Sequence, residues 1–247
     1  MIDSHVHVGW FVDRYHAPDE ITIALREVGI DTIAVSSTST CAEEYDYVIN
    51  EMLWFQEEWG EHVFPFLWIT PQMIRTEGIN KLLSAGIKWR GLKMHWQANP
   101  EFCYNSRLLH QVMAHVDLLN LPILLHTGEF PECHASVFES LLEQFHSRTF
   151  ILAHGRPLNE TEKLLEKFRN IYVDTAFMPI ENVLYLIKKG LSTKILWGSD
   201  CPINEHFYPK VSTPEYLKSQ LSNFRKEISK HIFLQITDHN FRKIYSP

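Results

Sequence analysis

The chain of 247 residues carries a formal net charge of -7, and 45% of its residues are hydrophobic, enough to bury a large core. The acidic balance and the lack of a Lys/Arg block argue against a nonspecific nucleic-acid surface, so we expect no nucleic-acid partner. No apolar stretch approaches the roughly 18 residues of a membrane span, and the start does not read as a secretory signal. Four cysteines without a CxxC pair are typical of reduced thiols. These features predict a cytoplasmic protein without a membrane partner.

Short apolar runs alternate with longer amphipathic segments along the chain. The runs predict strands at Ile2–Val8, Thr32–Ser36, Val63–Ile69, Gly91–His95, Pro122–His126, Phe150–His154, Ile171–Asp174 and Ile195–Gly198. The segments between them predict helices at Pro18–Val28, Ala42–Trp59, Ile79–Ala85, Ser106–Leu119, Ala135–Phe145, Glu160–Phe168 and Ile180–Lys189. Beyond Pro214 we expect further helices that close the fold.

Apolar strands separated by helices favour a parallel sheet whose outer face is covered by those helices. Eight such units, in a chain close to the typical length of about 250 residues, predict an α/β protein with a closed (β/α)8 TIM barrel. No linker, low-complexity tract or shift in composition divides the sequence, so we expect residues 1–247 to form a single domain.

The first predicted strand carries Asp3, His5 and His7 at alternate positions. Because alternate residues of a strand point to the same face, the carboxylate and both imidazoles are expected to lie together. Imidazole nitrogens and carboxylate oxygens are common ligands of divalent metals. The start of the chain therefore predicts part of a metal site.

Three later residues, His126, His154 and Asp200, each follow a short apolar run. In a TIM barrel the carboxyl ends of all strands meet at the catalytic face, so these side chains are expected to converge with the first strand's histidines. We predict that His5, His7, His126 and Asp200 bind a divalent metal, with zinc expected and manganese, iron or nickel able to use the same ligands.

Five motifs in order, IDSHVHV, GLKMHW, LLHTGE, LAHGRP and WGSDCP, cover nearly the whole chain. Together they resemble the amidohydrolase superfamily, most closely its amidohydrolase-related (amidohydrolase 2) branch. Members of that branch are (β/α)8 barrels that include small hydrolases and metal-dependent decarboxylases. The resemblance therefore implies the same barrel that the strand pattern predicts.

A metal-activated water would attack a carbonyl group, and Asp200 is expected to take its proton and pass it to the leaving group. The resemblance implies this same proton-shuttle role. His154 is expected to stabilise the developing oxyanion or to orient the substrate. In branches of the superfamily with two metals, the position of His154 instead supplies a ligand to the second metal.

The fourth predicted strand offers Lys93 and His95 but no Glu. Some relatives use a Glu or a carboxylated Lys there to bridge two metals, and Lys93 would do so only if it were carbamylated. We interpret Lys93 and His95 instead as groups that contact the substrate, or that contact the ligands of a single metal. Arg156 is a candidate clamp for a substrate carboxylate, or the partner in a surface ion pair. Asp3 is expected to fix the tautomer of an imidazole ligand.

These residues predict a metal-dependent hydrolase that cleaves an amide, cyclic amide or ester-like bond of a small-molecule substrate. The first alternative is a metal-dependent decarboxylase of a small aromatic acid on the same barrel. A phosphoesterase or nuclease of the TatD or PHP kind is a weaker alternative, because the fourth strand lacks Glu and the chain is acidic. A metal-binding scaffold without turnover is the non-enzymatic alternative, and a homo-oligomer is left open.

Overall fold

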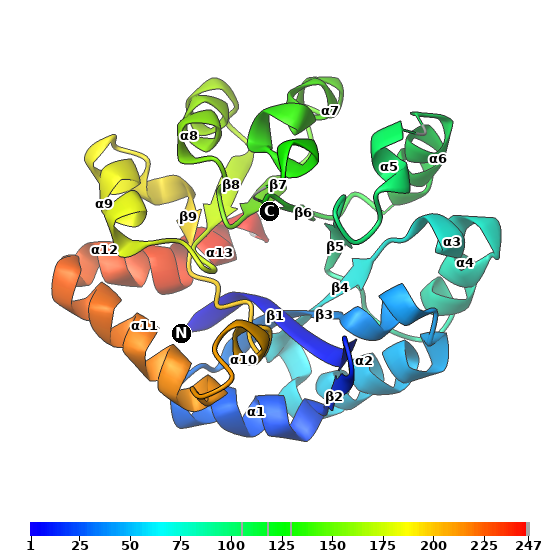
Figure 1. Cartoon of the computed structure of the whole chain (residues 1–247), viewed down its shortest axis with the longest axis horizontal. Coiled ribbons are helices and arrows are strands. Elements are labelled where there is room, and N and C mark those ends of the chain that lie inside the picture. Colours follow the sequence, from blue (N-terminus) through cyan, green and yellow to red (C-terminus); the bar gives the residue numbers. More distant parts are fainter. Residues whose placement is uncertain (105, 118, 129, 246–247) are drawn as a thin grey trace.

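The computed structural model describes residues 1–104, 106–117, 119–128 and 130–245, and shows strands enclosed by helices (Figure 1). The described strands form one sheet in the order β2-β1-β3-β4-β5-β6-β7-β8-β9. Their bounds are β1 Ile2–Phe11, β2 Arg14–His16, β3 Thr32–Ser37, β4 Val63–Trp68, β5 Gly91–Met94, β6 Ile123–His126, β7 Phe150–Ala153, β8 Ile171–Asp174 and β9 Ile195–Leu196. All neighbours from β1 to β9 pair in parallel, and only the short β2 pairs antiparallel with β1.

Backbone hydrogen bonds join the two ends of the parallel sheet. The N–H of Ser4 donates to the carbonyl of Trp197 at 3.0 Å, and the N–H of His7 donates to that of Cys201 at 2.8 Å. The N–H of Asp200 donates to the carbonyl of His5, also at 2.8 Å. These bonds hold the segment after β9 against β1, and the predicted TIM-barrel fold is confirmed.

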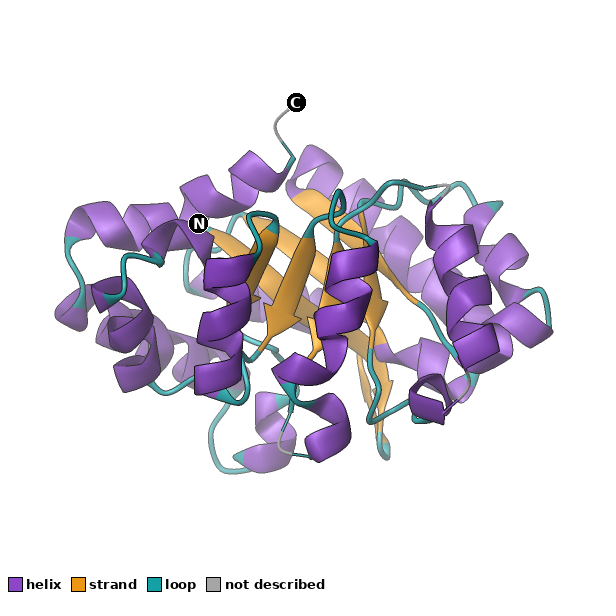
Figure 2. Cartoon of the chain, turned by 90° about the horizontal axis from the view of Figure 1, so that it is seen from above, coloured by secondary structure: helices purple, strands orange, loops and turns teal. Residues whose placement is uncertain are grey.

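Helices cover the outer face of the strands, as the view from above shows (Figure 2). The described α-helices are α1 Pro18–Glu27, α2 Tyr45–Trp59, α3 Pro71–Arg75, α4 Gly78–Leu83, α5 Glu101–Tyr104, α6 Ser106–Asp117, α7 Glu139–Gln144, α8 Leu158–Lys167, α9 Ile180–Lys188, α10 Asn204–Phe207, α11 Thr213–Glu227, α12 Lys230–Leu234 and α13 Asn240–Ile244. The large core lies between these helices and the sheet. A strand buried on both faces needs a continuous apolar run, which is what the sequence supplies.

A smaller apolar cluster fills the inside of the barrel and includes Leu124 of β6 and Phe66 of β4. Gly91 of β5 makes room for it, because a Cβ atom there would lie 2.3 Å from Cε1 of Phe66. The residues two positions later on these strands, His126, Trp68 and Lys93, share the same face. The apolar cluster inside the barrel therefore ends where the polar residues of the barrel mouth begin.

Several elements differ from the sequence-based expectation. The hairpin strand β2 was not expected, since three residues are too few for a periodic pattern. The helix expected from Ala42 begins at Tyr45, after a 3-10 turn over Thr38–Ala42. The expected end of α6 passes through residue 118, which lies outside the described residues.

Cys41, Cys133 and Cys201 form no disulfide within the described part of the chain, and the side chain of Cys103 lies outside it. None of the described helices combines the length and the apolar composition that crossing a bilayer requires. The expectation of one domain over residues 1–247 stays a prediction.

Candidate metal centre

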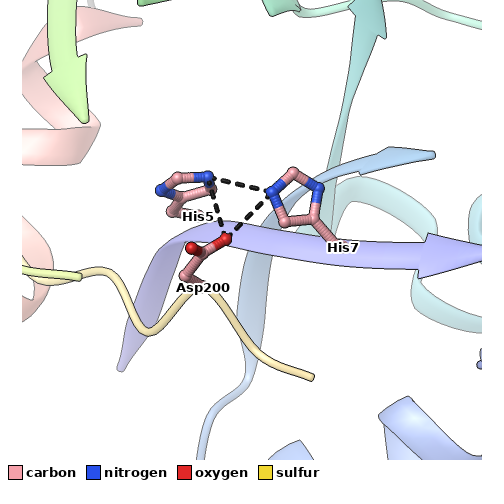
Figure 3. Close-up of side chains that lie close together, drawn as sticks. All are labelled: His5, His7 and Asp200. Carbon is pink, nitrogen blue, oxygen red and sulfur yellow. Dashed lines mark hydrogen bonds and ion pairs between the residues drawn. The ribbon is translucent and has the colours of Figure 1, made fainter. Parts of the chain in front are cut away.

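Three side chains converge at the mouth of the barrel. The Nε2 atoms of His5 and His7 lie 3.1 Å apart, and Oδ1 of Asp200 lies 3.3 Å from the first and 2.9 Å from the second (Figure 3). β1 carries both histidines, and Asp200 lies just after β9, where the sheet closes against β1. All three residues are buried. Their donor atoms form a group that could hold a metal ion.

Hydrogen bonds on the far side of each ring assign the tautomers. Nδ1 of His5 lies 2.8 Å from Oδ2 of Asp174, a carboxylate oxygen that accepts a hydrogen bond from the ring N–H. Nδ1 of His7 lies 3.3 Å from the carbonyl oxygen of Ser36, which can only accept, and 3.0 Å from the Ser36 hydroxyl. We therefore assign the proton to Nδ1 in both rings, which leaves both Nε2 lone pairs facing Asp200.

Charge on Asp200 is favoured by its surroundings. Burial alone would raise the pKa of Asp200, but positive charge on the surrounding His5, His7 and His154 would hold that pKa well below its usual range. Burial lowers the pKa of His5 well below its usual value, and the charge of Lys93 lowers it further. The structure therefore pairs a neutral imidazole with an ionised carboxylate, the forms that bind metals.

His154 and His126 lie beside this group. Nδ1 of His154 donates to the carbonyl of Ala176 at 3.0 Å, so its Nε2 lone pair faces Oδ2 of Asp200 at 3.8 Å and Nδ1 of His126 at 3.2 Å. The ring of His126 stacks on that of His95 with centroids 3.6 Å apart. Among the described residues His126 is not part of the His5–His7–Asp200 donor group, and its role as a ligand stays a prediction.

Lys93 extends from β5 into the same space. Its Nζ lies 3.0 Å from Nε2 of His5 and 5.7 Å from the centroid of the Trp68 ring. Burial lowers the pKa of Lys93 to about 8, while the charges of Asp200 and Asp174 oppose that shift. Lys93 is therefore a buried amine that lies within hydrogen-bonding distance of a proposed metal ligand.

Among the described residues the carboxylate of Asp3 has no imidazole partner and Asp174 binds the ring of His5, so the expectation that Asp3 fixes a ligand tautomer is wrong. Its carboxylate accepts the hydroxyl of Ser199 at 2.6 Å, the N–H of Ser199 at 3.0 Å and the N–H of His5 at 3.1 Å. Burial raises the pKa of Asp3 to about 7 despite these bonds. Asp3 holds the backbone on either side of the site, and Asp174 holds the imidazole instead.

The described residues fit a cation at this site. Three acceptors, the Nε2 atoms of His5 and His7 and Oδ1 of Asp200, face one another within hydrogen-bonding distance. Oδ1 of Asp200 and Nε2 of His126 are buried without a hydrogen-bond partner in the described part of the chain. Converging lone pairs repel unless a positive charge lies among them, and burial makes that cost larger. The ammonium of Lys93 supplies such a charge 3.0 Å from Nε2 of His5, and a metal ion would supply one to all three acceptors. Nitrogen and oxygen donors in this number suit a divalent transition metal.

A cavity of about 590 Å³ opens above the group. It is lined by every predicted site residue except the deeper His5, that is by His7, Lys93, His95, His126, His154, Arg156 and Asp200. Phe11, Phe130, Phe177 and Phe207 supply apolar walls. Nη2 of Arg156 donates to the carbonyl of Phe177 at 3.0 Å, which fixes the guanidinium at the edge of the cavity. The sequence thus located the cavity residues but missed Asp174, Ser36 and Trp68.

Comparison with solved structures shows the same fold at low identity. A probable 2-pyrone-4,6-dicarboxylic acid hydrolase from Acinetobacter baumannii, with citric acid bound, is 15% identical with a TM-score of 0.71 over 99% of this chain and 98% of the other. A 5-carboxyvanillate decarboxylase from Sphingomonas paucimobilis is 12% identical with a TM-score of 0.65 over 99% and 98%. A Novosphingobium aromaticivorans 5-carboxyvanillate decarboxylase, complexed with manganese, is 8% identical with a TM-score of 0.61 over 91% and 79%.

These structural matches, together with one to an amidohydrolase II, confirm the predicted resemblance to the amidohydrolase barrels. A search of curated proteins gave no match. The family model of TatD-related DNases matches residues 2–246, although the fourth strand lacks the Glu that would favour a TatD-type enzyme. Because that match spans almost all of the 247 residues, the chain belongs to the TatD-related DNase family.

Proposed function

We propose that this protein is a metal-dependent hydrolase that cleaves an amide, cyclic amide or ester-like bond in a small anionic molecule. The observation that carries the proposal is the convergence of His5, His7 and Asp200 at the floor of the 590 Å³ cavity. We propose these three as metal ligands, with His126 as the fourth predicted ligand. Zinc is the metal we expect, and manganese, iron or nickel suit the same donors.

These residues would hold a divalent ion, which would supply a Lewis acid able to acidify a water molecule and to polarise a carbonyl group. Oδ1 of Asp200 faces the Nε2 atoms of His5 and His7. Oδ2 of Asp200 faces His154 and lies 3.8 Å from Nε2 of that ring. We propose that Asp200 accepts a proton from water and hands it to the leaving group. We propose that His154, whose Nδ1–H donates to the carbonyl of Ala176, orients the substrate or stabilises negative charge that develops on it.

The cavity walls favour a flat, acidic substrate. Two cations, Lys93 and Arg156, line the cavity together with Phe130, Phe177 and other aromatic side chains. A planar guanidinium binds carboxylates with two parallel hydrogen bonds, and aromatic walls pack well on a ring. A volume of about 590 Å³ suits a small molecule rather than a polymer.

Two other reactions have specific support. Relatives of this fold are described as 5-carboxyvanillate decarboxylases, which favours decarboxylation as the first alternative. The family match favours hydrolysis of a phosphodiester, as in DNA. The net charge of -7 opposes the second, because a DNA backbone requires a positively charged surface.

The test is turnover of a substrate panel by the full chain loaded with zinc or manganese, run in H2-18O. The panel contains small carboxylated amides, cyclic amides and esters, aromatic carboxylic acids and a DNA oligonucleotide. We expect 18O in the product and no carbon dioxide. Release of carbon dioxide with no 18O in the organic product would assign a decarboxylase. Cleavage of DNA alone would assign a nuclease, and no turnover of any substrate class would favour a scaffold.

The variant Asp200→Asn tests the assigned proton transfer. We expect it to fold and to lose about a thousandfold in turnover, within the range typical of general acid-base catalysis. Asp13→Asn, the same change on the exposed hairpin, is the matched control. Full activity of Asp200→Asn would overturn the role that we propose for this carboxylate.

A further inference from the structure

A second cleft adjoins the cavity of the candidate site. It has a volume of about 380 Å³ and is lined by Phe177, Tyr208, Val211, Tyr216, Ser219 and Gln220, among others. We name it the outer cleft. Its lining comes from the turn before α9, from the segment after α10 and from α11, which Figure 1 shows next to one another.

Phe177 is the partition between the two spaces, because it lines both of them. The centroid of its ring lies 6.1 Å from that of His154 on the inner side. On the outer side it lies 6.0 Å from Tyr216 and 6.5 Å from Tyr208. The ring of Phe177 thus lies between the histidine site and the outer tyrosines.

Phe177 holds this place at a conformational cost. Its φ angle is 52°, a left-handed conformation that a bulky residue rarely adopts. The hydrogen bond from Nη2 of Arg156 to the carbonyl of Phe177, at 3.0 Å, anchors it there. Strained backbone of this kind is often found where a side chain must be held for binding.

The two spaces differ in charge. The inner cavity contains Lys93 and Arg156. The described residues that line the outer cleft include none with a charged side chain. The rings of Tyr208 and Tyr216 are stacked at 22° with centroids 6.0 Å apart. Tyr216 is buried and forms one wall of the cleft, whereas Tyr208 is 49% exposed and Val211 is 38% exposed. The cleft therefore presents apolar surface to a ligand.

We infer that the outer cleft is a second substrate subsite that receives a neutral aromatic group, while the acidic end of the same molecule occupies the inner cavity. This inference rests on the proposed function, because it extends the anionic substrate from one ring to two. The scissile bond would then join an acidic part inside to a neutral aryl part outside. The wall that the two spaces share at Phe177 and the change from cationic to uncharged lining carry the inference.

The test compares two probes that differ by one ring, benzoate and 4-phenoxybenzoate, by calorimetric titration of the zinc-loaded full chain. Benzoate reports on the inner cavity alone. We expect 4-phenoxybenzoate to bind about tenfold more tightly, because its second ring is removed from water in the outer cleft. Equal affinities would overturn the second subsite.

Two tryptophan variants on α11 locate the effect. Ser219 lines the outer cleft and is exposed, whereas Ser222 is exposed on the same helix and does not line it. We expect Ser219→Trp to abolish the tenfold gain and to leave benzoate affinity unchanged, and Ser222→Trp to leave both affinities unchanged. A gain that survives Ser219→Trp would contradict the inference.

The same measurements separate this inference from the proposed function. If benzoate binds and the second ring adds nothing, the outer subsite fails and the anionic inner site stands. If neither probe binds, both fail. Sedimentation of the wild type and of Ser219→Trp tests whether a second copy of the chain occupies the cleft instead. A wild-type dimer that Ser219→Trp dissociates would make the cleft an interface between two copies and would overturn the subsite.

Discussion

Replacing Asp174 by Asn is expected to weaken metal binding although Asp174 is not itself a proposed ligand. Oδ1 of Asp174 accepts the N–H groups of His154 at 2.9 Å and Ala176 at 3.0 Å, and Oδ2 lies 2.8 Å from Nδ1 of His5. An Asn can keep both bonds to Oδ1, but its amide group then faces the ring nitrogen. Because an amide NH2 only donates, His5 must move its proton to Nε2, where the lone pair for the metal would be.

The expected loss in metal affinity is about 10-fold to 100-fold, equivalent to about 1.4 to 2.7 kcal/mol. The assay is competition with a chelator of known affinity, in parallel with circular dichroism to show that Asp174→Asn is folded. Asp13→Asn, on the exposed hairpin, should bind metal like the wild type. A folded Asp174→Asn with unchanged affinity would refute the tautomer assignment.

Three further variants test two cations at the site and one buried carboxyl group on α2. Lys93→Met should tighten metal binding about tenfold, because an ammonium 3.0 Å from Nε2 of His5 competes with the ion; weaker binding in the chelator assay would contradict this. Arg156→Met should raise KM for an anionic substrate about tenfold with a smaller effect on kcat, and an unchanged KM would remove Arg156 from substrate binding. Burial raises the pKa of Glu51, so the carboxyl holds its proton more tightly in the folded chain than in the unfolded one, and stability falls as pH rises from the unfolded pKa to the folded one. Glu51→Gln should therefore gain in Tm over the wild type as pH rises from about 4 to about 8, whereas the exposed Glu57→Gln should not, and parallel Tm curves for Glu51→Gln and the wild type would show that this buried carboxyl does not carry the effect.

Local sequence pattern was sufficient for the barrel and for most of the cavity. Most strands are short apolar runs with a polar residue at or shortly after their carboxyl end. Because the carboxyl ends of parallel strands must meet, His126, His154 and Asp200 could be placed near His5 and His7 without coordinates. This reasoning uses only strand direction and alternation. It explains why the convergence of these side chains was predictable although they lie far apart in the chain.

The partners of the ligands were not predictable in this way. Asp174 ends a predicted strand like the other site residues, and that position was a signal that went unused. Choosing between Asp3 and Asp174 as the partner of His5 required the stagger between β1 and β8, because the nearer residue in sequence binds backbone and Ser199 instead. The hairpin strand β2 and the outer cleft depend on loop conformation, which no periodic pattern encodes.

The most direct test of this account is the metal itself. Elemental analysis of protein purified without chelator, combined with anomalous scattering from a crystal, gives the element, the number of ions and their ligands. We expect a divalent ion bound by Nε2 of His5, Nε2 of His7 and Asp200. A protein without bound metal after incubation with zinc or manganese, or an ion bound elsewhere with the imidazoles of β1 uninvolved, would contradict the central claim.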